Sequence, residues 1–281
     1  MEEIRYIASP TARKFHASKA LVRGIKGPVG SGKTVSCVNE IHRLAISQEP
    51  NSKGRRLTRV GIIRNTLNEL RSTTLNTFSQ WIPSQVCKIV YNPMIKAIIN
   101  YTLPDETVVH CECIFVSLDR PEDTRKLLSL ELTGVFINEA REIAEEILIA
   151  AKERVGRYPA MIDGYKTNNA CTRKFIIMDT NPPSDMHYWF RMAEVETPKG
   201  YEFFSSPPPL IAQPNGTYTP NPLAENIKYL PGGYQYYFDL IEGSPRERIN
   251  VMVLGNYGEA RFGKPVYPEY NDILHCENTA I

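Results

Sequence analysis

The chain has 281 residues, of which 42% are hydrophobic and 23% charged, a composition typical of a globular protein that buries a full core. Its 33 Lys and Arg residues against 31 Asp and Glu exclude a polycation that coats DNA, so any contact with nucleic acid must be local. No stretch is long and apolar enough to cross a bilayer, and the amino-terminal residues lack the basic start and apolar run of a secretory signal. We therefore expect a cytosolic protein with no membrane partner.

The amino-terminal part of the chain predicts a strand, a glycine-rich loop and a helix. The strand is expected over Lys19–Lys26, and the helix over Lys33–Ile46, where apolar residues recur at helical spacing. A buried strand over Arg59–Arg64 and a helix rich in Thr and Ser over Asn65–Trp81 follow. The basic segment Lys53–Arg59 is the candidate DNA contact, although such segments are more often solvated connectors.

Three further strands are expected next, over Lys88–Tyr91, Ile95–Tyr101 and Thr107–Val116, and they are typical of an antiparallel insertion or edge. The last strand places Cys111 and Cys113 on one face, where packing in the core is favoured over metal binding. The six cysteines are scattered without a C-x-x-C pair, so neither a disulfide framework nor a zinc site is indicated.

Helices and strands then alternate towards the middle of the chain. The expected elements are a polar helix over Asp119–Leu130, a short apolar strand over Leu132–Glu139, a helix over Glu142–Val155, a strand over Lys174–Met178 and a helix over Ser184–Val195. This alternation predicts an α/β fold with a doubly wound, mainly parallel sheet flanked by helices.

Composition changes near Ser205, where a segment rich in Pro, Gly and Tyr begins. We predict a core over residues 1–205, a small subdomain over 206–260 that lies against it, and a linker over 261–281.

One contiguous motif carries the strongest chemical signal. Residues Gly27-Pro28-Val29-Gly30-Ser31-Gly32-Lys33-Thr34 match G-x-x-x-x-G-K-[ST] between a predicted strand and a predicted helix. In such a P-loop the backbone amides surround phosphate oxygens, Lys33 bridges the β and γ phosphates, and Thr34 offers its hydroxyl to Mg²⁺. The motif predicts binding of ATP with Mg²⁺.

A nucleotide triphosphatase also needs a carboxylate that orients the attacking water, and Glu139 at the end of a predicted strand is the candidate. Asn138 precedes it, where an aspartate that helps to hold Mg²⁺ is usual. Either Asn138 hydrogen-bonds a Mg²⁺-bound water, which we favour, or Asp179 at the end of the next strand supplies the carboxylate.

Small polar residues follow Asp179. Thr180 or Asn181 is a candidate sensor of the γ-phosphate; the alternative is a plain connector in which Ser184 caps the next helix.

Phosphoryl transfer also profits from an arginine that stabilises developing charge. We favour Arg125 as this catalytic residue. Arg154 and Arg157 are alternatives, and Arg120 and Arg141 are weaker ones.

Four segments in this order, GPVGSGKT, VFINEAREI, the stretch Arg154-Val155-Gly156-Arg157-Tyr158-Pro159 and MDTNPPS, resemble the ATPase domain of the large terminase subunit of tailed bacteriophages. The resemblance covers nearly the whole chain, and the last three segments are much more specific to terminases than the Gly-Lys-Thr sequence. It implies a P-loop NTPase of the ASCE type with a lid subdomain after Ser205. It also implies that Glu139 is the catalytic carboxylate and that Thr180 and Asn181 couple hydrolysis to movement.

The resemblance further implies ATP-driven packaging of double-stranded DNA into a procapsid, in the host cytoplasm and not as part of the virion. The implied partners are DNA, a portal ring, a small terminase subunit and further copies of the chain, commonly in a five-membered ring with an arginine inserted from the neighbour. A nuclease domain follows the ATPase in this family, and we expect no nuclease activity from this chain. Two other functions stay open: a P-loop helicase or remodeller, and a nucleotide-dependent binding protein that has lost hydrolysis.

Overall fold

The polypeptide is organised around a twisted sheet, which the computed structural model describes over residues 5–118, 121–166 and 170–258. Within these ranges the sheet has eight strands in the order β3-β4-β5-β2-β6-β7-β1-β8. The strands are β1 Val22–Lys26, β2 Arg55–Arg64, β3 Cys87–Val90, β4 Lys96–Thr102, β5 Val108–Ser117, β6 Gly134–Ile137, β7 Phe175–Thr180 and β8 Tyr201–Ser205.

Six of these strands, from β5 to β8 across the sheet, run parallel, whereas β3 and β4 form an antiparallel edge. The predicted antiparallel insertion or edge is therefore confirmed for the first two strands and only half right for the strand over Thr107–Val116. β5 pairs antiparallel with β4 on one side but parallel with β2 on the other. Its alternating burial is the reason: such a pattern fits a half-covered strand of either direction.

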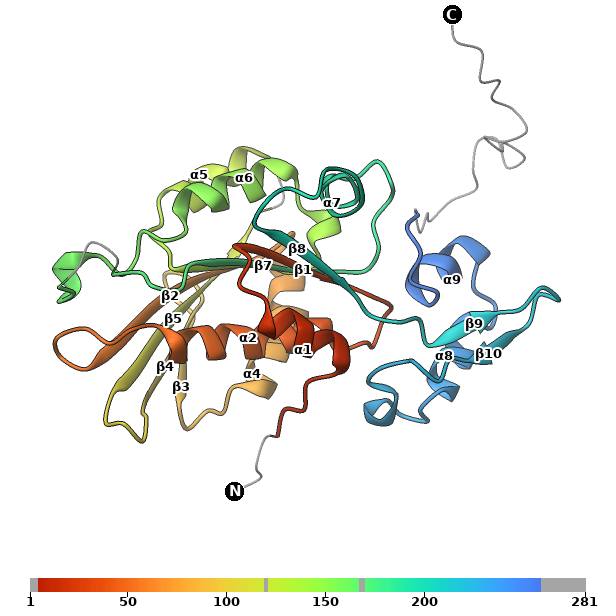
Figure 1. The fold of residues 1–281 in the computed structure, drawn as a ribbon, viewed down its shortest axis with the longest axis horizontal. Coiled ribbons are helices and arrows are strands. Elements are labelled where there is room, and N and C mark those ends of the chain that lie inside the picture. The colour runs from red at the N-terminus through yellow and green to blue at the C-terminus, as the bar shows by residue number, and fades with distance from the viewer. Residues whose placement is uncertain (1–4, 119–120, 167–169, 259–281) are drawn as a thin grey trace, which may run out of the picture.

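Helices cover both faces of the sheet (Figure 1). On one face lie α1 Pro10–Ala17, α2 Lys33–Ser47 and α4 Asn76–Trp81, and on the other lie α5 Thr124–Leu128, α6 Glu145–Arg154 and α7 Tyr188–Phe190. Each layer has its own apolar core, with Phe15, Ile41 and Phe78 in one and Leu148 and Trp189 in the other. The predicted doubly wound, mainly parallel α/β sheet is confirmed.

Two helical segments contain π-helical turns. The segment predicted over Asn65–Trp81 is divided into α3 Leu67–Glu69, a π-helix over Leu70–Leu75 and α4. A second π-helix, Arg191–Glu196, follows α7. The cap of α7 is His187, whose ring nitrogen accepts from the Trp189 N–H at 3.1 Å, so Ser184 does not cap this helix as the alternative reading of this turn had it.

The remaining short helices are the 3-10 turns Pro121–Asp123, Ala140–Glu142, Met161–Asp163 and Ile227–Tyr229. Sequence reasoning did not predict α1 or β8. β8 is a half-exposed edge strand, with no apolar run that would reveal it.

Residues 206–258, hereafter the 206–258 segment, contain β9 Leu210–Ala212, β10 Tyr218–Pro220, α8 Gln235–Ile241 and α9 Arg246–Met252. Their apolar side chains form a small core around Leu210, Tyr237, Ile249 and Val253. Figure 1 shows the segment beside the end of the sheet where β8 leaves it. The predicted lid role of this segment stays a prediction, and the predicted linker over 261–281 lies outside the described residues. Among the residues that the structure describes, no helix has the length and apolarity that a membrane span requires.

Candidate active site

The phosphate loop connects β1 to α2 at the carboxyl end of the sheet. Gly30 and Gly32 adopt left-handed backbone angles, with φ of 75° and 81°, which glycine alone adopts without strain. Within the described ranges, the N–H groups of Gly30 and Ser31 have no protein acceptor. Free amides at a helix start form an anion-binding site, as the sequence predicts for a P-loop.

Lys33, the first residue of α2, is buried, with 7% of its surface exposed. Its Nζ donates to the Gly27 and Pro28 carbonyls at 3.0 and 2.8 Å and to Asn181 Oδ1 at 3.0 Å. Burial lowers the pKa of Lys33, while the nearby carboxylates Glu139 and Asp179 act in the opposite direction. The ammonium group therefore lies between the phosphate loop and the end of β7.

Asp179 is the carboxylate that contacts the phosphate-loop threonine. It is fully buried in β7, and its two oxygens accept from Thr34 Oγ1 at 2.5 Å, Asn138 Nδ2 at 2.8 Å and the Glu139 N–H at 3.1 Å. Burial raises the pKa of Asp179, and the charge of Glu139 adds to this effect. Of the two readings of the sequence, the geometry favours the one in which Asp179 supplies the carboxylate, because it is Asp179 and not Asn138 that contacts the Thr34 hydroxyl at short range.

Asn138, at the end of β6, is a bridge between elements. Its amide nitrogen donates to Asp179 and lies 3.5 Å from Thr34 Oγ1, and its oxygen accepts from Thr74 Oγ1 at 2.6 Å. Thr74 lies in the π-helix Leu70–Leu75, a kind of irregular turn that often occurs at functional sites. Sequence reasoning missed Thr74, because a threonine in a predicted helix gives no signal of its own.

Glu139 follows β6 in a left-handed conformation, with φ of 53° and ψ of 60°. This geometry costs a residue with a side chain on the order of 1–2 kcal/mol, and such strain is concentrated at functional sites. The carboxylate is 20% exposed, lies 3.6 Å from Arg141 Nε and accepts from the Asn181 N–H at 3.4 Å. Neither contact is short, so the carboxylate keeps acceptor capacity for a further donor such as water.

Thr180 and Asn181 connect these groups, and their role in coupling stays a prediction. Asn181 contacts Glu139 through its N–H and Lys33 through its side chain. Thr180 Oγ1 accepts from the Arg141 N–H at 3.2 Å, and its carbonyl accepts from the Gly27 N–H at 3.3 Å. The end of β7 thus touches both the phosphate loop and the turn that carries Glu139.

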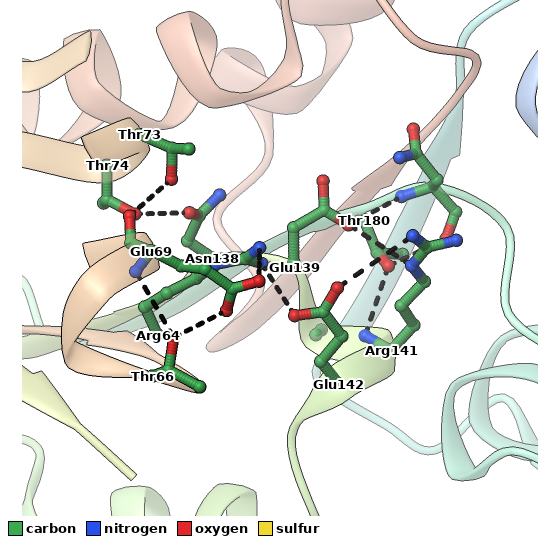
Figure 2. Close-up of polar contacts among 12 residues, drawn as sticks. Arg64, Thr66, Glu69, Thr73, Thr74, Asn138, Glu139, Arg141, Glu142 and Thr180 are labelled. Carbon is green, nitrogen blue, oxygen red and sulfur yellow. Dashed lines mark hydrogen bonds and ion pairs between the residues drawn. The ribbon is translucent and has the colours of Figure 1, made fainter. Parts of the chain in front are cut away.

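A row of alternating charges extends from Glu139 along the carboxyl ends of the strands β6 and β2 (Figure 2). Arg141 lies between Glu139 and Glu142, and Arg64 at the end of β2 lies 3.3 Å from Glu142 and 3.6 Å from Glu69. Burial raises the pKa of Glu142, with Glu139 and Glu69 acting in the same direction and Arg64 against it. Arg141, ranked below Arg125 from the sequence, is the arginine that lies beside Glu139.

Arg125, the favoured catalytic arginine, lies in α5, is exposed, and makes no side-chain hydrogen bond or ion pair within the described part of the chain. The structure therefore does not bring it to the P-loop of its own chain. Arg154 donates to the Leu128 carbonyl at 3.0 Å, and Arg157 Nε donates to the Glu153 carbonyl at 2.9 Å, so each is held by its own chain. Arg120 lies outside the described residues.

A cavity of about 780 Å³ opens beside Ser31 and Gly32. Apolar side chains from four parts of the chain line it: Tyr6, Ile7, Val35, Trp81, Leu223 and Tyr229. Its volume is within the range of small-molecule sites, which are mostly apolar. Sequence reasoning missed this cavity, because its walls come from the amino-terminal segment, α2, α4 and the 206–258 segment.

The residues around Thr34 fit a magnesium site. The Asp179 carboxylate and the Thr34 hydroxyl are oxygen donors, and Mg²⁺ in nucleotide sites takes one or two protein ligands together with phosphate oxygens and waters. Among the described residues no group of three or more His, Cys, Asp or Glu side chains could hold a metal alone. The donors thus suit an ion that arrives with its nucleotide.

Two secondary candidates from the sequence have other partners. In the basic segment, Arg56 and Arg59 pair with Asp105 and Glu112 at 2.8 and 2.6 Å. Cys111 and Cys113 share one buried face as predicted, with their sulfur atoms 3.8 Å apart.

The fold resembles that of phage large terminases. Over 89% of the chain it matches the large terminase of a thermophilic bacteriophage in complex with ADP, with a TM-score of 0.62 at 14% identity, and it covers 53% of that chain. The HK97 bacteriophage large terminase gives a TM-score of 0.57 at 10% identity, with 90% of this chain and 51% of that chain covered. The large terminase ATPase domain of Thermus phage P74-26 gives 0.51 at 14% identity, with coverages of 90% and 95%.

The chain therefore spans about half the length of the first two terminases and nearly all of the P74-26 ATPase domain. No protein-family model and no curated protein sequence matches it. At these identities the likeness concerns architecture, and on that ground the chain shares the fold seen in phage large terminases, including the P74-26 terminase ATPase domain.

Proposed function

We propose that this chain hydrolyses ATP and that hydrolysis drives the packaging of double-stranded viral DNA. The observation that carries the proposal is that two carboxylates from neighbouring strands lie near the phosphate loop. Asp179 contacts Thr34, and Glu139 contacts Asn181, which also binds Lys33. A site that only bound nucleotide would need neither the strained Glu139 backbone nor its partly exposed carboxylate. The fold shared with large terminases supports the coupling to DNA.

The phosphates of ATP are bound by the loop amides and by Lys33. Glu139 accepts a hydrogen bond from the attacking water and takes its proton. The water oxygen bonds to the γ-phosphorus while the bond from that phosphorus to the β–γ bridging oxygen breaks, and ADP leaves. Asp179 and Thr34 would hold Mg²⁺, which would supply positive charge to neutralise the nucleotide phosphates. Asn181 contacts both Lys33 and Glu139, so it is placed to sense whether the γ-phosphate is present.

We propose that the adenine base occupies the cavity beside Ser31 and Gly32, because this cavity opens next to two residues of the phosphate loop. Tyr6, Val35 and Trp81 offer apolar surface to the base. A free triphosphate without a base should consequently bind much more weakly than ATP.

The finer parts of the role follow from the likeness to terminases. We propose that the chain works in the host cytoplasm on a procapsid, in a ring of copies, commonly five, docked on a portal. The small terminase subunit would deliver DNA, and the neighbour's Arg125 would complete each site. Exposure of Arg125 and its lack of side-chain partners within the described residues are compatible with insertion into a neighbour.

The test of motor function is the stimulation of turnover. ATP hydrolysis is measured with the chain alone, with double-stranded DNA, and with DNA and portal-bearing procapsids. We expect the rate to rise with DNA and again with procapsids. A rate that neither addition changes would contradict the packaging role and leave a generic ATPase, and nucleotide binding without any turnover would favour a binding protein. DNA cleavage by the chain would contradict the expectation that it has no nuclease activity.

A further inference from the structure

The 206–258 segment is attached to the backbone of the phosphate loop. Tyr237 donates its hydroxyl hydrogen to the Val29 carbonyl at 2.8 Å, and Asn226 Nδ2 donates to the Gly30 carbonyl at 2.7 Å. The Val29 N–H donates in turn to the Met252 carbonyl at 2.9 Å. All three contacts fall on two consecutive loop residues.

These carbonyl contacts fix the direction of the loop amides. In a planar trans peptide the C=O of one residue and the N–H of the next point in opposite directions. A hydrogen bond from Tyr237 to the Val29 carbonyl therefore turns the Gly30 N–H away from the 206–258 segment. Asn226 does the same for the Ser31 N–H through the Gly30 carbonyl. These two N–H groups have no protein acceptor in the described ranges, and they belong to the P-loop.

Tyr237 contacts both the small core of the 206–258 segment and the phosphate loop. Its ring is 1% exposed in the small core with Leu210, Ile249 and Val253, while its hydroxyl reaches the loop. A Cβ atom at Gly30 would lie only 3.1 Å from that hydroxyl. The loop and the 206–258 segment consequently touch so closely that a shift of one must change the contacts of the other.

Asn226 is also held firmly. It adopts a left-handed conformation with φ of 68°, which Asn tolerates better than most residues. The preceding Glu225 accepts from the Thr11 N–H and hydroxyl, both at 2.8 Å, and from Ser9 Oγ at 2.7 Å. The Asn226 side chain therefore extends from a backbone that is fixed to the start of α1.

We propose that Tyr237 and Asn226 are positioning residues that orient the phosphate-loop amides, so that nucleotide affinity depends on the seating of the 206–258 segment. The inference rests on the proposed function, since its ligand is a nucleotide phosphate. Linkage between two equilibria is reciprocal: if seating strengthens nucleotide binding, bound nucleotide strengthens seating by the same factor.

The experiment measures ADP affinity by fluorescence titration, together with KM and kcat for ATP. Tyr237→Phe removes one hydroxyl and keeps the ring in its core, and Asn226→Gly removes the amide and keeps the backbone angle. Each should weaken ADP binding and raise KM about three- to tenfold, the effect of losing one neutral hydrogen bond, with kcat nearly unchanged. ADP should also slow hydrogen exchange of α8 amides in the wild type, and less so in each variant.

The matched control is Tyr234→Phe. It removes a hydroxyl whose hydrogen bond, 2.6 Å to the Asn221 carbonyl, stays inside the 206–258 segment. This variant should bind ADP like the wild type even if its melting temperature falls. Equal affinity of all four proteins, or an equal loss in the control, would overturn the inference. Absence of ADP binding by the wild type would instead overturn the proposed function.

Discussion

The carboxyl ends of β6 and β7 lie side by side, yet they hold their carboxylates in opposite ways. Asp179 on β7 is fully buried and accepts three hydrogen bonds. Glu139 after β6 is 20% exposed and has contacts of only 3.4 and 3.6 Å. A carboxylate with fixed donors is suited to hold an ion in place, and one with spare acceptor capacity is suited to take a proton. We propose that Asp179 and Glu139 divide between them the two roles of holding the ion and accepting the proton.

The chain around each carboxylate explains this division. All six residues of β7 are buried, so Asp179 must find its partners inside the protein. β6 ends at Ile137, and Glu139 itself adopts the left-handed conformation that turns the backbone out of the strand. Asn138 between them donates to Asp179, which an aspartate at that position could not do while ionised.

The largest expected effect is that of Glu139→Gln, which removes the proton acceptor and keeps the shape. We expect turnover to fall by up to about 10⁴-fold, the upper range for loss of a general base. ATP affinity should be nearly unchanged, as measured by equilibrium binding of a labelled nucleotide. Retained hydrolysis in this variant would remove Glu139 from the mechanism.

Arg125→Ala tests whether each site is completed by a neighbour. In assembled rings we expect a loss of about 10³-fold, typical of an arginine that stabilises the transferring phosphoryl group. Mixing Arg125→Ala with Glu139→Gln protein should restore part of the turnover, because some interfaces then combine an intact Glu139 with an intact Arg125.

Arg141→Ala is the matched comparison for the mixing experiment. Arg141 contacts Glu139 within one chain, so its loss should not be repaired by mixing with Glu139→Gln protein. If only the Arg141 variant is rescued, the assignment of Arg125 is wrong.

Asp179→Asn tests the proposed role of Asp179 in holding Mg²⁺. We expect the Mg²⁺ concentration needed for half-maximal turnover to rise about 10- to 100-fold, a typical cost of disturbing the coordination of a metal. The double variant Asn138→Asp with Asp179→Asn returns the carboxylate to the more usual strand and should recover part of this loss. An unchanged Mg²⁺ requirement in Asp179→Asn would favour the reading in which Asn138 acts through a water.

Glu40 is a buried carboxylate that stabilises the fold and serves as a control for Asp179. In α2 it is 2% exposed and pairs with Arg23 and His16, both at 2.6 Å. Glu40→Gln leaves the Arg23 charge uncompensated and should lower the free energy of unfolding by about 3–5 kcal/mol. Turnover per folded molecule should stay near that of the wild type. If Glu40→Gln and Asp179→Asn lose turnover equally, the loss in Asp179→Asn follows from neutralising a buried carboxylate and not from a role in catalysis.

This stabilisation has a defined pH dependence. Burial alone would raise the pKa of Glu40, but the His16 hydrogen bond and Arg23 hold it below its ordinary value. A lowered carboxyl pKa stabilises the fold above the unfolded-state pKa, about 4.3, and the contribution disappears as pH falls through the folded-state pKa. The difference in melting temperature between wild type and Glu40→Gln should therefore shrink below about pH 4, and a constant difference would contradict this.

The sequence predicts contiguous features well and assembled features poorly. The phosphate loop, the strand before Glu139 and the helix over α2 can all be read locally, because glycines, apolar runs and helical spacing act over short distances. Three other features form only when particular strands and helices become neighbours. They are the contact of Thr74 with Asn138, the contact of Asp179 with Thr34, and the cavity beside Ser31. Asp179 illustrates the limit: its position at a strand end made it a candidate, but only the sheet order places it against the phosphate loop.

The most direct test of the account is the release of phosphate from ATP by the wild-type chain and by Lys33→Ala, measured in the presence of Mg²⁺. Lys33 contacts the phosphate loop and Asn181, so the account predicts steady release by the wild type and almost none by the variant. Absence of release by the wild type in rings assembled on procapsids, or equal release by both proteins, would contradict it.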